Sequence, residues 1–263
     1  MPDCIRASEC ELRFSCPYAR MFEPAAITGG PSGLADWPRP FVFRARHLDG
    51  LTLAPGAEFH FDVNLFDTGV QATAYLIRAF AELAREGLGP GRRTVELARV
   101  LQLPSPLELS LAREKEPLSR LCVRFVTPTE LKRGQQVATE PVFGVLAARI
   151  RDRISTLRQL YGPGPLDMDF RAFGERASRV RMTHCELRRF DVKRRSSRTG
   201  QVHPIGGFVG EAEYEGDLAE FVPYLRAAKW TGVGRQTVWG KGEIEVLNPA
   251  SGEVIDNLAA LYR

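Results

Sequence analysis

The chain has 263 residues, of which 44% are hydrophobic and 26% are charged, as in ordinary globular proteins. No run approaches the roughly 20 apolar residues that a membrane helix needs, and the N-terminus lacks the apolar core of a signal peptide. Five cysteines, an odd count, favour a reducing compartment over a disulfide framework. We therefore expect a cytoplasmic protein of one large or two small domains, with no membrane partner.

The first part of the chain predicts the order β-β-α-β. Residues 1–38 combine many Pro, Gly and Cys residues with little periodicity, so we expect mostly loop there. Alternating apolar residues then predict strands, and apolar residues three or four apart predict a helix between them. The predicted elements are strands at 41–47 and 57–66, a helix from Asp67 or Thr68 to Gly87, and a strand at 92–101.

The second part predicts β-α-β-β-α-β, which is the split βαβ arrangement of ferredoxin-like folds. It follows a proline-containing connection at 103–117, which is the candidate linker. The first part would be the same fold without its opening strand and helix. The predicted elements are strands at 118–127, 180–192, 205–216 and 238–246, a helix from Thr139 to Gly162, and a helix that begins near Pro223.

From these elements we expect four segments. They are an irregular Cys-containing N-terminal segment at 1–38, an incomplete ferredoxin-like domain at 39–103, a ferredoxin-like domain with a glycine-rich loop at 117–248 and a C-terminal tail at 249–263.

Positive charge is concentrated in residues 171–200. The chain carries a net charge of +4, but this segment holds ten Lys or Arg residues against three acids, a net +7. Such a concentration is typical of a nucleic-acid site. A solvated charged hairpin is the alternative, disfavoured because like charges crowd together without local partners. Four of the cations lie in the predicted connection between two strands: Lys193, Arg194, Arg195 and Arg198.

A glycine-rich stretch, WTGVGRQTVWGKGEIEV, spans residues 230–246. Its paired glycines suit backbone with positive φ, and cations stand between them, a pattern that favours contact with phosphate. A dinucleotide fingerprint has a strand before the loop and a helix after it, whereas here the helix comes first. A glycine-rich turn without a ligand is the alternative. The predicted phosphate-binding residues are Gly232, Gly234, Arg235, Gly240, Lys241 and Gly242.

The glycine-rich stretch, the run SSRTGQVHPIGGFVGEAEYEGDLAEFVPYL before it and CPYARMFEP at 16–24 resemble the CRISPR-associated repeat-RNA-processing endoribonucleases. These enzymes belong to the RAMP superfamily of ferredoxin-like RNA-binding proteins. The glycine-rich loop resembles the superfamily at large, whereas the run HPIGGF at 203–208 resembles a narrower group within it. The resemblance implies an α+β fold of tandem ferredoxin-like (RAMP/RRM-like) domains. It also implies RNA partners, namely the repeat transcript and the guide RNA, with other CRISPR effector subunits as further candidates.

Relatives usually carry a strand and a helix ahead of the Cys-Pro-Tyr segment, and their catalytic base often comes from that helix. The sequence given begins after this point, so the resemblance leaves the base unassigned.

Cleavage of RNA by its own 2′-hydroxyl needs a base, an acid and cations, but in principle no metal or other cofactor. Histidine suits either proton-transfer role because its unperturbed pKa lies near neutrality. His203, at the end of the basic connection, is the preferred catalytic residue, and a loop histidine bonded to its own turn is the alternative. We expect His184 in the core and His60 in solvent or at a domain interface, while His47 faces either way.

Trp230 and Trp239 flank the glycine-rich loop. We expect Trp230 to stack on an unpaired base and Trp239 to anchor the loop on the core. Cys4, Cys10 and Cys16 have no zinc-site spacing and lack a fourth ligand, so no metal is expected. We expect the two remaining cysteines, Cys122 and Cys185, to be small core residues.

The preferred function is therefore a metal-independent endoribonuclease that cleaves CRISPR repeat RNA to give mature guide RNA. The alternative is a non-catalytic RAMP subunit that binds guide RNA in an effector complex. A ferredoxin-like module with no RNA role is disfavoured by the charge of residues 171–200.

Overall fold

The computed structural model describes residues 7–26, 37–67, 70–89, 91–103, 105–191, 193–195, 200 and 202–255. Its contacts divide the chain into two compact units: residues 1–40 with 65–108, and residues 41–64 with 109–263. This grouping does not decide the domain limits expected from the sequence, which remain a prediction.

The larger unit is built on one four-stranded antiparallel sheet in the order β10-β3-β9-β6. The chain order is strand, helix, strand, strand, helix, strand, with one additional helix, which confirms the predicted ferredoxin-like arrangement and the α+β class. The strands are β3 (Arg120–Thr129), β6 (Arg181–Phe190), β9 (Gly207–Glu215) and β10 (Ile244–Leu247), and the helices are α3 (Phe143–Tyr161), α4 (Phe170–Ser178) and α5 (Val222–Thr231).

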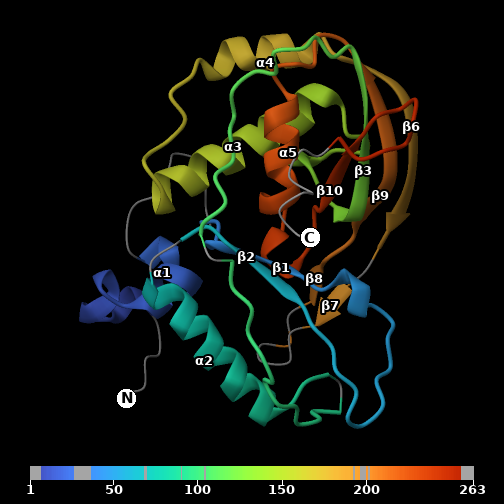
Figure 1. Cartoon of the computed structure of the whole chain (residues 1–263). Helices are drawn as coiled ribbons and strands as arrows, with labels where there is room; N and C mark the ends of the chain where they lie inside the picture. The colour runs from blue at the N-terminus through green and yellow to red at the C-terminus, as the bar shows by residue number, and fades with distance from the viewer. Residues whose placement is uncertain are drawn as a thin grey trace. The chain divides into compact units, whose positions relative to one another are not determined.

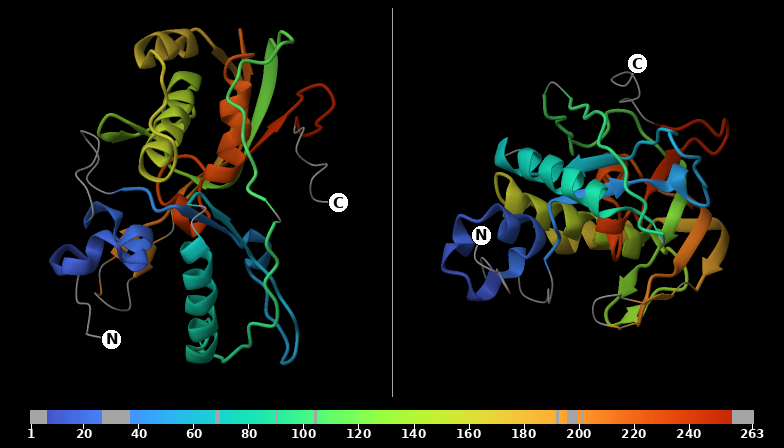
Figure 2. Two further views of the ribbon diagram at one scale, coloured as in Figure 1. Left: turned by 60° about the vertical axis from the view of Figure 1, so that its left-hand side comes forward. Right: turned by 90° about the horizontal axis from the view of Figure 1, so that it is seen from below.

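The three helices lie on one face of this sheet (Figures 1 and 2). Alternate β3 residues Leu121, Val123 and Phe125 are buried beneath them, as period-two patterning dictates. Phe143 of α3 meets Tyr214 of β9 edge-on, with ring centroids 5.0 Å apart. The buried Tyr214 hydroxyl donates to the carbonyl oxygen of Pro141 at 2.7 Å, which fixes the entry to α3.

The opposite face of the sheet carries charged side chains. Arg124 of β3 lies between two glutamates, with Nε 2.7 Å from Glu211 Oε1 and Nη1 3.2 Å from Glu245 Oε2. Arg120 pairs with Glu213 beside them. A platform of alternating ion pairs offers no field of one sign to a phosphate backbone. This face is therefore a poor RNA surface.

Small elements flank the sheet. β1 (Phe41–Arg44) and β2 (Asp62–Leu65) pair with each other and are shorter than the strands predicted there. Two further ribbons are β4 (Lys132–Arg133) with β5 (Gln136–Val137), and β7 (Lys193–Arg195) with β8 (Val202–Pro204). The remaining 3-10 turns of this unit are η4 (Arg46–Leu48) and η5 (Thr237–Trp239), and η5 replaces the predicted beginning of the last strand.

The smaller unit is mostly helical. The predicted helix is confirmed as α2 (Val70–Glu86). The predicted strand at 92–101 is wrong, because the described residues 91–103 form only one isolated bridge, between Arg93 and Leu88. Preceding elements are η1 (Ala7–Glu9), η2 (Glu11–Phe14), α1 (Pro17–Phe22) and η3 (Pro24–Ala26).

None of the described helices is long and apolar enough to cross a bilayer.

The buried face of α3 gives a stability test. Leu146 is fully buried in the core, so Leu146→Ala should lower the free energy of unfolding by about 2–5 kcal/mol. Val142, just before α3, is 46% exposed, and Val142→Ala should change it by less than about 0.5 kcal/mol. Chemical denaturation of the two variants checks this, and equal losses would contradict the assigned core.

Candidate nucleic-acid interface

The glycine-rich loop follows α5 and is bonded to the end of β3. Its Arg235 amide donates to the Glu130 carbonyl at 3.1 Å, and its Gly242 amide donates to the Pro128 carbonyl at 3.2 Å. Across the loop, the Val233 amide donates to the Gly242 carbonyl at 2.8 Å. These three amides donate to protein carbonyls, and the phosphate contact expected of the loop remains a prediction.

Close packing explains the glycines. All four have positive φ, between 68° and 87°. A Cβ on Gly234 would lie 2.3 Å from the Glu130 carbonyl oxygen, and one on Gly242 would lie 1.9 Å from the Val233 carbonyl oxygen. The glycines thus allow the loop to lie against β3 and to close on itself.

The two cations of the loop have different roles. Lys241 is buried, and its Nζ donates to the Gly206 carbonyl at 2.6 Å and to Gln236 Oε1 at 2.9 Å. Burial lowers the pKa of Lys241. Arg235 has a half-exposed side chain, and its Nη1 lies 2.6 Å from Glu130 Oε1. Lys241 therefore ties the loop to the HPIGGF run, and Arg235 is the loop cation that solvent reaches.

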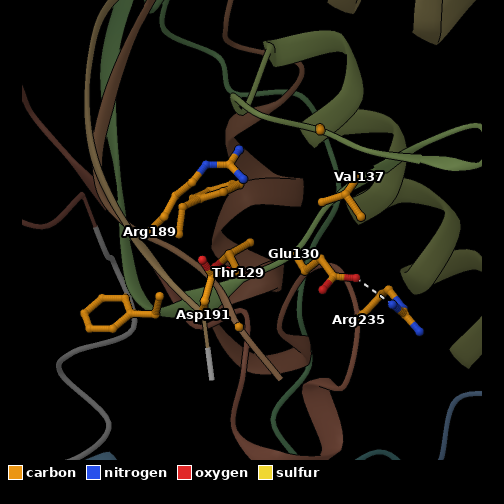
Figure 3. A pocket seen from close by; sticks show the side chains of 11 residues that line it. Thr129, Glu130, Val137, Arg189, Asp191 and Arg235 are labelled. Atoms are coloured by element: carbon orange, nitrogen blue, oxygen red, sulfur yellow. Dashed lines mark hydrogen bonds and ion pairs between the residues drawn. The ribbon is translucent and has the colours of Figure 1, made fainter. Parts of the chain in front are cut away.

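A cavity of about 480 Å³ opens beside the loop, at one end of the sheet (Figure 3). Buried Thr129 and Phe208 lie at its base, and buried Glu130 forms a wall. Exposed residues of β5, β6 and the loop stand at its rim: Val137, Arg189, Asp191 and Arg235. We call this cavity the sheet-end pocket.

The basic hairpin β7–β8 is joined by the chain to two strands, β6 and β9, whose ends line the sheet-end pocket. β6 ends at Phe190 and β9 begins at Gly207, both of which line the pocket, and the hairpin is the connection between them. In that hairpin Arg194 pairs with His203 across the ribbon. The side chains of Lys193, Arg194, Arg195 and His203, and all of Arg198, lie outside the described residues.

Other cations of residues 171–200 do have acidic partners, contrary to our expectation. Arg176 makes two bonds of 2.6 Å to Glu220, and Arg171 Nε lies 3.0 Å from Glu175. Both arginines belong to α4, a helix that we did not predict. Its signal was Asp169, whose carboxylate caps the amides of residues 171 and 172 at 2.9 Å.

One of the histidines, His184, differs from its prediction. His184 is exposed on the charged face of β6 rather than buried. His47 and His60 are both exposed, and their rings stack with centroids 4.5 Å apart. His47 Nε2 donates to the His60 carbonyl oxygen at 2.8 Å. His47 follows β1, and His60 precedes β2. The strand β1 contacts η5, which lies in the glycine-rich loop.

Trp239, not Trp230, is the more exposed tryptophan. Trp239 is 46% exposed on η5, so it does not anchor the loop in the core as expected. Trp230 lies in the last turn of α5, where its carbonyl accepts from Asn64 Nδ2 at 2.9 Å.

The cysteines show no metal centre within the described residues, where no group of three or more candidate ligands is found. Cys10 and Cys16 are free thiols, and Cys4 lies outside the described residues. Cys122 is buried, which raises the pKa of its thiol to about 12, and Cys185 is half-buried.

The sheet order and the connections between its strands define a ferredoxin-like domain. Residues 123–244 match the family model of the CRISPR-associated endoribonuclease Cas6, and residues 2–119 match a model described as the AF_1859_N N-terminal domain. The match over residues 123–244 bears out the expected resemblance to the CRISPR-associated repeat-RNA-processing endoribonucleases.

Two solved structures are similar to the chain. A Thermus thermophilus Cas6 product complex is 24% identical, with a TM-score of 0.55, over 90% of this chain and 91% of its own. Another Cas6 product complex is 21% identical, with a TM-score of 0.49, over 80% of this chain and 85% of its own. The first supports the tandem ferredoxin-like fold along most of the chain. A comparison with curated proteins found no match.

The loop packing gives a direct test. Gly234→Ala should destabilise the chain by about 1–3 kcal/mol, because φ is +87° and the new Cβ meets the Glu130 carbonyl. Gly174→Ala is the matched control, since that helical glycine has nothing within 4 Å and alanine favours helix. Thermal unfolding compares them, and a Gly234→Ala variant as stable as the control would refute the packing role.

Proposed function

We propose that the chain is a metal-independent endoribonuclease that cleaves CRISPR repeat RNA by 2′-hydroxyl attack and yields guide RNA. The main observation behind this proposal is the match of residues 123–244 to the Cas6 endoribonuclease family model. Support also comes from the sheet-end pocket and from the basic hairpin that borders it. We place this activity in the cytoplasm, and other CRISPR effector subunits remain candidate partners.

RNA binding in this proposal uses side chains rather than loop amides. Arg235 and Arg189 stand at the pocket rim and can meet phosphates directly. The glycines and Lys241 hold the loop in shape behind them. Trp239 replaces Trp230 as the stacking residue because of its exposure. The hairpin cations contact the RNA backbone: Lys193, Arg194, Arg195 and Arg198.

The chemistry needs one group to remove the 2′-hydroxyl proton and another to protonate the departing 5′-oxygen. His203 is the proposed proton carrier, because it lies in β8 of the basic hairpin, shortly before Gly206 and Gly207, which line the pocket. His47 is the histidine to compare with His203, because it follows β1, the strand that contacts η5 of the loop.

The alternative is a RAMP subunit that binds guide RNA without cutting it. One observation favours it: among the residues that the structure describes, those that line the sheet-end pocket include no histidine. In that case the repeat binds tightly but stays intact.

The mechanism predicts its products. Cleavage by the 2′-hydroxyl leaves a 2′,3′-cyclic phosphate on the 5′ fragment and a 5′-hydroxyl on the 3′ fragment. Cleavage should continue in EDTA, and a single 2′-deoxy substitution at the cut should abolish it. Mass spectrometry of the fragments checks this. Activity lost in EDTA and restored by Mg²⁺ would overturn the mechanism, and uncut repeat RNA bound tightly would favour the alternative.

Proton transfer predicts the effect of one variant. His203→Ala should slow single-turnover cleavage by about 10²–10⁴-fold with RNA affinity preserved. His184→Ala, on the charged sheet face, should leave the rate unchanged. If His47→Ala rather than His203→Ala gives the large loss, the base belongs to the 41–64 segment.

The basic hairpin predicts a change in salt dependence. Removing one cation that binds a phosphate of single-stranded RNA should reduce the slope of log K against log salt by about 0.7. Alanine at Lys193, Arg194, Arg195 and Arg198 should therefore flatten that slope. Arg120→Ala with Arg181→Ala, on the charged face, is the control and should not. An unchanged slope in the hairpin variant would remove the hairpin from the interface.

A further inference from the structure

The sheet-end pocket has the size and lining of a site for one small planar group. Its volume of about 480 Å³ falls within the range of ligand pockets, roughly 300–1,000 Å³. Phe208 at its base is held edge-on by Phe125, with ring centroids 5.0 Å apart. Ala138 and Val137 add apolar surface on another side. A nucleobase that leaves its stack would bury its faces here.

We propose that this pocket takes one unstacked base of the RNA and that Glu130 selects guanine. The inference rests on the proposed function, because it requires RNA at this end of the sheet. It adds a base-specific contact to an interface otherwise made of cations and phosphates.

Glu130 is the polar group that can read a base edge. Its side chain is only 10% exposed, and one oxygen, Oε1, accepts from Arg235 Nη1 at 2.6 Å. A carboxylate offers about four acceptor positions, so acceptors remain for a ligand in the pocket that this side chain lines. The Arg235 bond also fixes the carboxylate in place (Figure 3).

Guanine fits an acceptor-only group best. Its Watson–Crick edge presents two adjacent donors, N1–H and the 2-amino group. Adenine and cytosine each present one amino donor beside an acceptor, and uracil presents one N–H between two carbonyls. Any base other than guanine would bring an acceptor against the carboxylate or leave it partly unpaired, which is costly in a buried site.

Two cations at the rim of the pocket can bind the phosphate of the nucleotide whose base enters the pocket. Arg189 is exposed, and its Nη2 donates to the Thr139 carbonyl at 2.8 Å, which holds its side chain beside the opening. Arg235 stands at the loop side of the same rim. A base in the pocket would therefore leave its phosphate between two guanidinium groups.

The test uses the full chain and five-nucleotide RNAs of uridine with one varied central base. Fluorescence anisotropy should show binding of the guanine RNA about tenfold or more tighter than adenine, cytosine or uracil. Inosine, which lacks the 2-amino group, should lose part of this preference. The analogue 7-deazaguanine keeps the same edge and should retain it. Equal affinities for the four bases would overturn the proposal.

Two variants locate the site. Val137→Trp should fill the pocket and remove the guanine preference without touching the Arg235–Glu130 pair. Val142→Trp is the control, because Val142 is similarly exposed but does not line the pocket. A guanine preference that survives Val137→Trp would place base reading elsewhere.

Glu130→Gln separates the carboxylate from pocket shape. It should lower the preference of guanine over inosine, with the fold checked by circular dichroism. Cleavage of the repeat by the unmodified chain is measured in parallel. Cleavage without base preference contradicts only this inference, whereas base preference without cleavage contradicts only the proposed enzyme.

Discussion

Backbone hydrogen bonds between the glycine-rich loop and the end of β3 hold this end of the molecule together. The carbonyls of Pro128 and Glu130 accept from loop amides, and the Lys241 ammonium carries the connection on to the Gly206 carbonyl. Glycine at 234 allows the loop to approach the Glu130 carbonyl, and glycine at 242 allows it to approach the Val233 carbonyl within the loop. The loop, β3 and the beginning of β9 therefore form one unit, and the sheet-end pocket is the space that they enclose.

In the proposed function, charge placement brings RNA to this end of the sheet rather than to the open sheet face. On that face Arg124 is flanked by Glu211 and Glu245, so its charge is balanced within the protein. At the sheet end, by contrast, Arg189 donates to a neutral carbonyl and keeps its charge for a ligand. The basic hairpin leaves the sheet at the same end. Under this proposal an RNA strand would be attracted to the edge of the sheet, where the loop also lies.

Much of the fold could be predicted from the sequence because the larger unit follows simple periodicities. Its apolar residues alternate along β3 and recur at helical spacing along α3, so the order of elements was recoverable. The strand at 92–101 was predicted from alternation as well, but a strand also needs a partner to bond. The chain offers residues 91–103 a single bridge, which local pattern does not reveal.

The site was less predictable, because residue type does not show where a side chain points. Lys241 and Arg235 look alike in sequence, yet one is buried against two acceptors and the other reaches solvent. The same ambiguity affected Trp239, which was expected to anchor the loop on the core but is 46% exposed. Glu130 was missed altogether. A single acid at the end of an apolar strand carries no motif, and only the fold brings it to the pocket.

The central claim is that the loop is formed by bonds within the protein and presents side chains, not amides, to RNA. Amide hydrogen exchange at Val233, Arg235 and Gly242, with and without repeat RNA, tests it most directly. We expect slow exchange at all three amides in the free chain and little change when RNA binds. Fast exchange in the free chain that becomes slow only with RNA would contradict the account, because those amides would then be bonding to the phosphates.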